Sequence, residues 1–222
     1  LMLLRPHDAT GTIKRKADET HIRFDGKTTL TVGFECRSKR VGETVRVKKT
    51  VEGVARAMSE LGCAIEETSP DRTWPTLRQY PPRLEFVKAD RNLSEPFDYP
   101  DTDTEIVVPE ADALESLLPT ASLLHYLGAT ATVEEGATAH VRVGSETFPL
   151  GDDPETVDKT ASEFLRRVFF LDCYARAPSP HGKALGGEDV LGGIGMEAEY
   201  LYEQSLADRV QAYLDLPDTD VA

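Results

Sequence analysis

The stretch PETVDKTASEFLRRVFFLDCYAR, residues 154–176, is the strongest helical signal in the chain and is central to its fold class. Asp152 or Asp153 supplies the N-terminal cap, and Pro154 fits the first turn, where its missing N–H has no helical partner to lose. The apolar residues that form a core-facing stripe are Val157, Ala161, Phe164, Leu165, Val168, Leu171 and Ala175. Aromatic residues widen this stripe at Phe169, Phe170 and Tyr174. We therefore expect the second half of the helix to be buried on several sides or to form an interface.

Just before this helix, short apolar runs separated by turn residues predict strands at 129–133, 139–143 and 146–150. Glu135-Gly136 and Gly144-Ser145 are turn signals between them, so we expect a small antiparallel unit. Further upstream, the sequence predicts a short helix over 111–118, a second over 121–127 with Gly128 as its C-cap, and strands at 84–87 and 105–109.

The N-terminal half contains one clear helix, which begins after Thr50. Its apolar residues form one stripe, namely Val51, Val54, Ala55, Met58 and Leu61. Gly62 stands where a left-handed C-cap belongs, and residues 63–65 predict a strand. Earlier still, the strand-like segments 21–24 and 28–34, the second of which alternates polar and apolar residues, flank Asp25-Gly26, which predicts a β-hairpin.

Together these elements predict an α+β fold of short, mostly antiparallel strands in two lobes. We expect a β-rich lobe with one helix over residues 1–92, and a small sheet plus helices over residues 93–222. The polar, proline-punctuated stretch 88–104 is the expected linker, and the C-terminal third is expected to be mainly helical.

The charge balance restricts the partners. The 222 residues carry 39 Asp and Glu against 25 Lys and Arg, a formal net charge of −14. Such a chain repels nucleic-acid phosphates and anionic lipid, so we expect neither nucleic acid nor membrane as a partner. The acids are scattered and Lys is scarce (9 against 16 Arg), which indicates a halophilic, acidic surface. No apolar run spans a bilayer and no secretory segment is evident, so we expect a cytoplasmic protein; the start without Met suggests a piece of a longer chain.

No catalytic or metal-binding motif is recognisable in the sequence. The cysteines are Cys36, Cys63 and Cys173, and the histidines are His7, His21, His125, His140 and His181. Their spacing matches no zinc site, and no nucleophile elbow or phosphate-binding glycine loop is present. The cysteines lack the electropositive surroundings that stabilise a thiolate, so we expect buried structural thiols, no cofactor and no metal.

The proline-rich loop over residues 68–83 is the candidate binding surface. Its binding residues are predicted to be Arg72, Trp74, Arg78 and Tyr80, since Arg and aromatic side chains dominate binding hot spots. Four prolines lower the entropy lost when the loop is ordered. The alternative is an ordered crossing, in which Trp74 packs on the core and the arginines pair with acids of the same chain.

Two segments carry a resemblance to a known family. AMSELGCA (57–64) and TSPDRTWPTLR (68–78) resemble the middle region of long, uncharacterised haloarchaeal proteins that carry a caspase-like CHAT domain near the C-terminus. Later segments with the same likeness are 105–109, 123–129, 168–173, 201–203 and 206–210, so that about residues 50 to 217 are covered. The resemblance implies a region upstream of the protease-like domain, with the catalytic His and Cys beyond residue 222.

The sequence therefore favours a non-catalytic interaction or regulatory region of a larger multidomain cytoplasmic protein. Its partner would be another protein or another domain of the same chain. One alternative is a cysteine-dependent hydrolase that uses Cys173 or Cys63 with a spatially adjacent His. Another is a small-molecule sensor with a pocket between the lobes.

Overall fold

The structure, a computed structural model, divides the chain into two compact units, residues 1–39 and 40–222. The residues that it describes are 2–7, 10–15, 20–34, 44–62, 64–65, 67–75, 77, 81–88, 93–95, 102–179 and 197–216. Helices and strands are mixed along the chain, so the predicted α+β class is confirmed.

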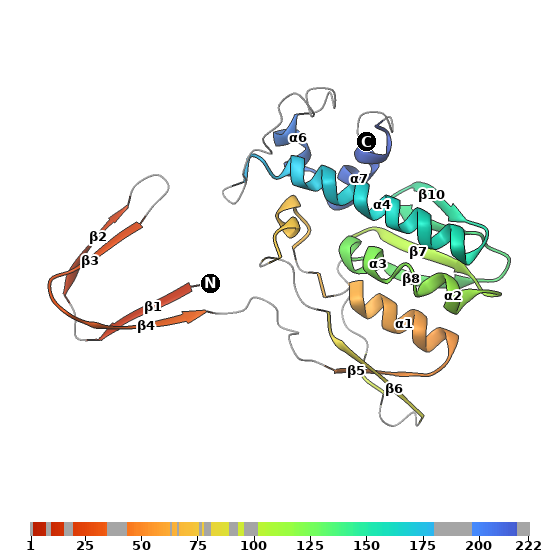
Figure 1. The fold of residues 1–222 in the computed structure, drawn as a ribbon, viewed down its shortest axis with the longest axis horizontal. Helices are drawn as coiled ribbons and strands as arrows, with labels where there is room; N and C mark the ends of the chain where they lie inside the picture. Colours follow the sequence, from red (N-terminus) through yellow and green to blue (C-terminus); the bar gives the residue numbers. More distant parts are fainter. Residues whose placement is uncertain are drawn as a thin grey trace. The chain divides into compact units, whose positions relative to one another are not determined.

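The first unit is a two-stranded antiparallel structure, which we call the ribbon. Its strands are β1 (Met2–His7), β2 (Gly11–Arg15), β3 (Thr20–Phe24) and β4 (Thr29–Phe34). β1 pairs with β4, and β2 pairs with β3, both antiparallel (Figure 1). Along the described residues, each strand therefore has one paired neighbour, and the ribbon is two strands wide.

The prediction that Asp25-Gly26 joins two paired strands is wrong. The flanking strands β3 and β4 pair with β2 and β1 instead of with each other. The backbone N–H of Asp25 donates to the Thr10 carbonyl at 3.0 Å, and the Thr28 hydroxyl donates to the His7 carbonyl at 2.7 Å. These bonds hold the dipeptide against the opposite strand, so it forms a bend along one side of the ribbon.

The second unit contains a four-stranded sheet in the order β10-β9-β7-β8 (Figure 1). Its strands are β7 (Thr104–Pro109), β8 (Thr130–Glu134), β9 (Ala139–Val143) and β10 (Glu146–Gly151). β9 pairs antiparallel with β10, as expected, and also with β7, whereas β8 pairs in parallel with β7. The expected antiparallel β8–β9 pairing is corrected because two helices carry the chain from β7 to β8, which is the connection that parallel strands need.

Strand alternation gives the sheet an apolar and a polar face. Ile106 pairs with Val141 in the register, and both are fully buried. The next pair along, Glu105 and Arg142, is only half-buried and forms an ion pair on the opposite face. The apolar face therefore faces the helices.

Helices cover the sheet as one packed layer. They are α1 (Val51–Gly62), α2 (Ala113–Leu117), α3 (Ala121–Leu127) and α4 (Pro154–Ala175). α2 and α3 contact β7, α4 contacts β10, and α1 lies against β8, α2 and α3. The predicted helices over 51–61, 121–127 and 154–176 agree with this layer, and Asp153 caps α4 by accepting the N–H groups of Glu155 and Thr156, both at 3.0 Å.

Two details of the helix predictions need correction. Gly62 is the last residue of α1 and has no positive φ, whereas Gly128 after α3 has a φ of 63° and is the left-handed cap that was expected. Ala64 and Ile65 form a turn on the end of α1 instead of a strand, because their N–H groups donate to the Leu61 and Gly62 carbonyls. Cys63 lies outside the described residues.

The predicted boundary at residues 92/93 falls inside the second unit. β5 (Thr44–Lys48) pairs in parallel with β6 (Arg83–Val87), and α1 contacts both β5 and the sheet strand β8. Helix α1 thus joins residues on both sides of that boundary into one core. The division of the chain lies between Lys39 and Arg40 instead.

The C-terminal part adds α6 (Ala198–Glu203) and α7 (Leu206–Leu214), both of which contact α4. The buried face of α4 matches the predicted stripe except at Leu165, which is partly buried, and at Asp172, which was not expected. Phe169 and Phe170 are more than a third exposed, so the second half of α4 is not buried all round. In the described part of the chain, no helix is both long and apolar enough to cross a bilayer.

Candidate functional site

The proline-rich loop over residues 68–83, which was the candidate binding surface, contains a short 3-10 helix, η1 (Pro70–Thr73). This helix is buried along its whole length. Ser69 caps it, since its hydroxyl accepts the Asp71 N–H at 3.3 Å, and Pro70 occupies the first position. η1 packs against α4. This part of the loop therefore lies in the interior of the second unit.

A buried charge cluster, which we call the Asp172 cluster, consists of Asp172, Arg72, Arg209, Tyr126 and Tyr213. Nε and Nη2 of Arg72 lie 2.8 and 2.7 Å from Oδ2 of Asp172, and Nε of Arg209 lies 3.0 Å from Oδ1. The phenol of Tyr126 donates to Oδ2 at 2.8 Å, and that of Tyr213 donates to Oδ1 at 3.1 Å. The side chains of Asp172 and of both arginines are fully buried.

The arginines also bond the backbone around the cluster. Nη1 of Arg72 donates to the Tyr126 carbonyl at 2.9 Å, and its guanidinium carbon lies 4.3 Å from the centre of the Tyr126 ring. Nη1 of Arg209 donates to the Gln204 carbonyl at 3.0 Å, and its Nη2 donates to the Thr68 carbonyl. The cluster therefore ties η1, α3, α4 and α7 together.

The electrostatics of the cluster keep its groups in fixed charge states. Burial by itself raises the pKa of Asp172, but the Arg72 and Arg209 guanidiniums and the Tyr126 hydroxyl outweigh burial and hold that pKa below its ordinary value. Burial and the Asp172 carboxylate both raise the pKa of Tyr126 and of Tyr213. Asp172 is thus an anion and both phenols are neutral donors at neutral pH.

The structure corrects the role predicted for Arg72. A guanidinium that is fully buried and paired with Asp172 cannot contact a partner. Trp74 is half-buried, and the guanidinium carbon of Arg176 lies 4.8 Å from the centre of its ring. Arg78 and Tyr80 lie outside the described residues. For Arg72 the ordered-crossing alternative therefore holds.

The sequence did not predict that Arg72 pairs with Asp172, although the position of Asp172 in its helix was a signal for a buried partner. Asp172 follows Val168 by four residues, so it occupies the core-facing stripe of an apolar helix. A carboxylate at such a position needs a cationic or donor partner. The sequence separations of 100 residues to Arg72 and 37 to Arg209 hide which side chains supply it.

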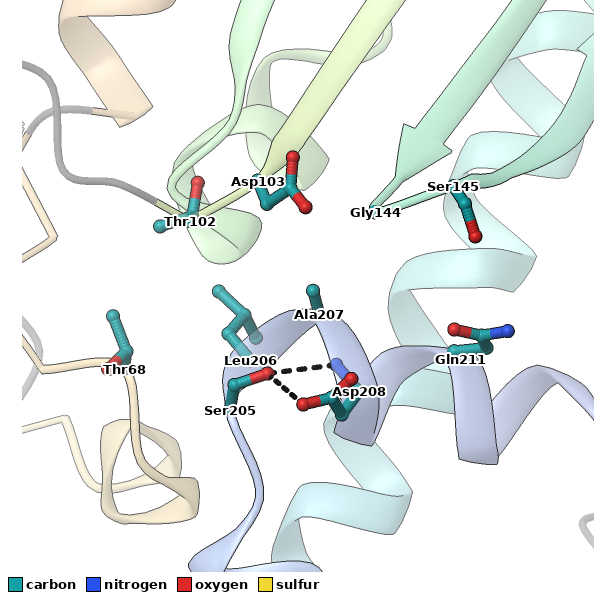
Figure 2. Close-up of a pocket in the computed structure, with 10 residues that line it drawn as sticks. All are labelled: Thr68, Thr102, Asp103, Gly144, Ser145, Ser205, Leu206, Ala207, Asp208 and Gln211. Atoms are coloured by element: carbon teal, nitrogen blue, oxygen red, sulfur yellow. Dashed lines mark hydrogen bonds between the residues drawn. The ribbon is translucent and has the colours of Figure 1, made fainter.

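A pocket of about 550 Å³ lies beside the start of α7 (Figure 2). Asp103 and Ser145 come from the sheet side, Asp208 and Gln211 come from α7, and Thr68 also lines the pocket. Ser205 caps α7: its hydroxyl accepts the Asp208 N–H at 3.1 Å and donates to the Asp208 carboxylate at 2.6 Å. Hydroxyl, amide and carboxylate groups of this kind suit a small polyhydroxylated or cationic solute.

Asp103, at the edge of this pocket, has a left-handed backbone with a φ of 48°. The Gly144 N–H donates to its carbonyl at 2.8 Å, which holds the turn before β7. We expect Asp103→Ala to lower the free energy of unfolding by about 1 kcal/mol and Asp103→Gly to leave it unchanged or higher, because glycine alone has no Cβ penalty there. Urea unfolding followed by Trp74 fluorescence measures the free energy of unfolding of both variants. Equal values for the two would contradict the claim that the left-handed backbone at Asp103 is strained.

The ribbon exposes an apolar cross-strand pair. Ile13 and Ile22 are direct partners in the register and are 67% and 40% exposed. The pairs on either side include the exposed Lys14 and Arg23, which by strand alternation belong to the opposite face. Residues 1–39 contain eight Lys and Arg and five Asp and Glu, a formal charge of +3, so residues 40–222 carry −17.

The second unit has a groove of about 390 Å³ with a mixed polar and apolar lining between α3 and α4, which we call the α3–α4 groove. Pro119 and Ser122 line one side, and Asp158, Leu165 and Arg166 line the other. On α2 and at its end, Leu114 is 39% exposed and Leu118 is 61% exposed.

The cysteines and histidines of the hydrolase alternative are only partly described. Cys173 is half-buried on α4, and Cys63 and His181 lie outside the described residues. His125 is held by the Leu61 carbonyl, 2.9 Å from its Nδ1, and His140 by the Thr138 carbonyl at 2.8 Å. Within the described residues, no three His, Cys, Asp or Glu side chains form a group that could hold a metal ion.

Comparison with protein-family models gave no match, and comparisons with curated proteins and with solved structures gave none either.

Proposed function

We propose that this chain is a non-catalytic interaction region of a larger multidomain cytoplasmic protein, and that the ribbon is its binding element. The observation that carries the proposal is the exposed Ile13–Ile22 pair on a two-stranded ribbon. The resemblance of residues 50–217 to the region that precedes a CHAT domain supports the larger protein. The acidic composition supports a salt-rich cytoplasm.

The argument from the ribbon rests on its stability. A two-stranded hairpin is marginally stable in water and needs a third strand or a packed layer on one face. Full burial of an isoleucine side chain contributes about 1.5–3 kcal/mol relative to its exposed state. A partner that covers Ile13 and Ile22 therefore supplies much of what the ribbon lacks.

The two alternatives have weaker support. A sensor would use the pocket beside α7, whose described lining offers two carboxylates but no buried, unbonded polar group aimed at a ligand. A hydrolase needs a Cys–His pair in an open cleft, and Cys173 is half-buried on α4 while the Nδ1 atoms of His125 and His140 lie against backbone carbonyls. The exposed apolar pair on the ribbon points directly to association with another protein surface.

The proposal is tested by photo-crosslinking in the cells from which the chain comes. A benzophenone amino acid replaces Ile13 in the full chain, and the control carries it at Glu135, an exposed turn residue of the second unit. We expect a discrete protein adduct from position 13 that is lost when Ile22 is also changed to Ser, and none from position 135. Equal labelling from both positions, or no adduct from position 13, would contradict the proposal.

A further inference from the structure

We propose that Arg176 and Trp74 form a recognition site for a side-chain carboxylate of a protein partner, a contact of the second unit that goes beyond the proposed function and does not depend on the ribbon. The guanidinium carbon of Arg176 lies 4.8 Å from the centre of the Trp74 ring. Arg176 follows the last residue of α4, and Trp74 follows the last residue of η1. Both residues are half-buried, so each keeps part of its surface in solvent.

The guanidinium of Arg176 is held in a fixed orientation. Its Nη1 donates to the Thr73 hydroxyl, which in turn donates to the Pro70 carbonyl at 2.9 Å. Thr73 is buried in η1, and η1 packs against α4, so this anchor is part of the core. The hydrogen bond and the contact with the Trp74 ring restrict the side chain before a ligand arrives, which lowers the entropy lost on binding.

The other edge of the guanidinium has a donor without an acceptor. Among the residues that the structure describes, Nε of Arg176 is buried and has no hydrogen-bond partner. A buried donor without an acceptor costs free energy, which an incoming acceptor recovers. Nε and Nη2 together form the edge of an arginine that binds both oxygens of a carboxylate through two parallel hydrogen bonds.

The same edge is already used by Arg72, whose Nε and Nη2 lie 2.8 and 2.7 Å from Oδ2 of Asp172. The carboxylates on the adjoining turns face other groups. Asp172, four residues before Arg176, is paired with Arg72 and Arg209, and Asp71 accepts the Tyr202 phenol at 3.1 Å. In the described part of the chain, Arg176 is therefore an oriented guanidinium without a carboxylate, and a partner supplies one.

The charge of the chain favours a carboxylate over a phosphate at this site. A net charge of −14 repels a dianionic phosphate more strongly than a group with a single negative charge. The planar fork of the guanidinium also matches the planar pair of carboxylate oxygens. An acidic side chain on a protein surface has both properties.

Trp74 is the single tryptophan of the chain, so its fluorescence reports directly on this site. The full chain is titrated at constant ionic strength with a blocked tripeptide that has a central glutamate, and with the same tripeptide carrying glutamine. We expect the glutamate peptide to change the Trp74 emission saturably and the glutamine peptide to leave it unchanged. Arg176→Lys keeps the charge but loses the fork, so it is expected to bind the glutamate peptide at least about tenfold more weakly.

The matched control is Arg166→Lys, an exposed position ten residues earlier on α4 and about 15 Å away along the helix. It is expected to bind like the wild type, and circular dichroism verifies that both variants are folded. Equal responses to the two peptides, no response to either, or an Arg176→Lys variant that binds as tightly as the wild type would each overturn the inference.

Two further probes test the choice of ligand. Inorganic phosphate that binds as tightly as the glutamate peptide would overturn the choice of anion. Acetate that binds where the peptide does not would make a small carboxylate, instead of a protein, the ligand. If Trp74 responds to none of these probes while position 13 still crosslinks to a protein, this inference fails and the proposed function stands.

Discussion

Asp172→Asn is expected to lower the free energy of unfolding by about 3–5 kcal/mol, the largest effect of any single substitution considered for this chain. The carboxylate is fully buried between Arg72 and Arg209, and both phenols donate to it. The amide keeps the shape but leaves two buried guanidiniums without a counter-charge. Urea unfolding followed by the fluorescence of Trp74, the single tryptophan, measures the loss.

Two comparisons separate this cause from a general effect on α4. Asp158→Asn removes an exposed carboxylate from the same helix and should change stability by less than about 0.5 kcal/mol. Replacing Asp172, Arg72 and Arg209 together by apolar residues of similar size should recover part of the loss, because no charge is then left unpaired. An Asp172→Asn variant as stable as the wild type would contradict the assignment.

The pH dependence gives an independent check of the same cluster. The folded-state pKa of Asp172 is depressed, so its stabilising contribution is present above its unfolded pKa, near 4, and is lost as pH falls through the folded pKa. Wild-type stability should therefore fall on acidification below about pH 4 more steeply than that of Asp172→Asn. Parallel acid profiles would show that Asp172 does not titrate in this way.

Local patterns explain which parts of the fold were predictable. The α3 and α4 helices follow from apolar spacing and end signals that lie within one stretch of chain, including Asp153 and Gly128. The strands that pair with β3 and β8 cannot be predicted from such local patterns, because strand pairing depends on residues far away in sequence. Asp25-Gly26 has the composition of a hairpin turn, yet bonds across the ribbon to Thr10 and His7 decide its shape.

The candidate site, too, was only partly predictable from the sequence. Sequence composition identified the loop around η1 as unusual, and the structure accounts for that composition by burying Arg72 against Asp172. An arginine that serves a core and one that serves a partner look alike in sequence, since both need a carboxylate at a fixed distance. The exposed Ile13–Ile22 pair was also hidden, because its exposure depends on the strands being only two wide.

The second large expected effect on stability comes from a substitution at Gly62, where α1 packs against the turn after α3. A Cβ on Gly62 would lie 2.2 Å from the Ala129 carbonyl oxygen and 3.0 Å from both the Ala129 nitrogen and the Gly128 carbonyl carbon. All three are backbone atoms of the turn that Gly128 forms with its φ of 63°. Ala129 is fully buried, so the turn has no free space into which it can shift.

Gly62→Ala is therefore expected to destabilise the second unit by about 2 kcal/mol. Alanine in a helix gains about 0.5–1 kcal/mol over glycine, but forcing a methyl group into a packed backbone contact costs about 1–3 kcal/mol or more, and a contact as short as 2.2 Å lies at the upper end. Gly26→Ala is the matched control, since a Cβ there meets nothing within 4 Å. Urea unfolding followed by Trp74 fluorescence compares the two. If Gly62→Ala is as stable as the wild type, then α1 does not approach the turn at Ala129 as closely as described.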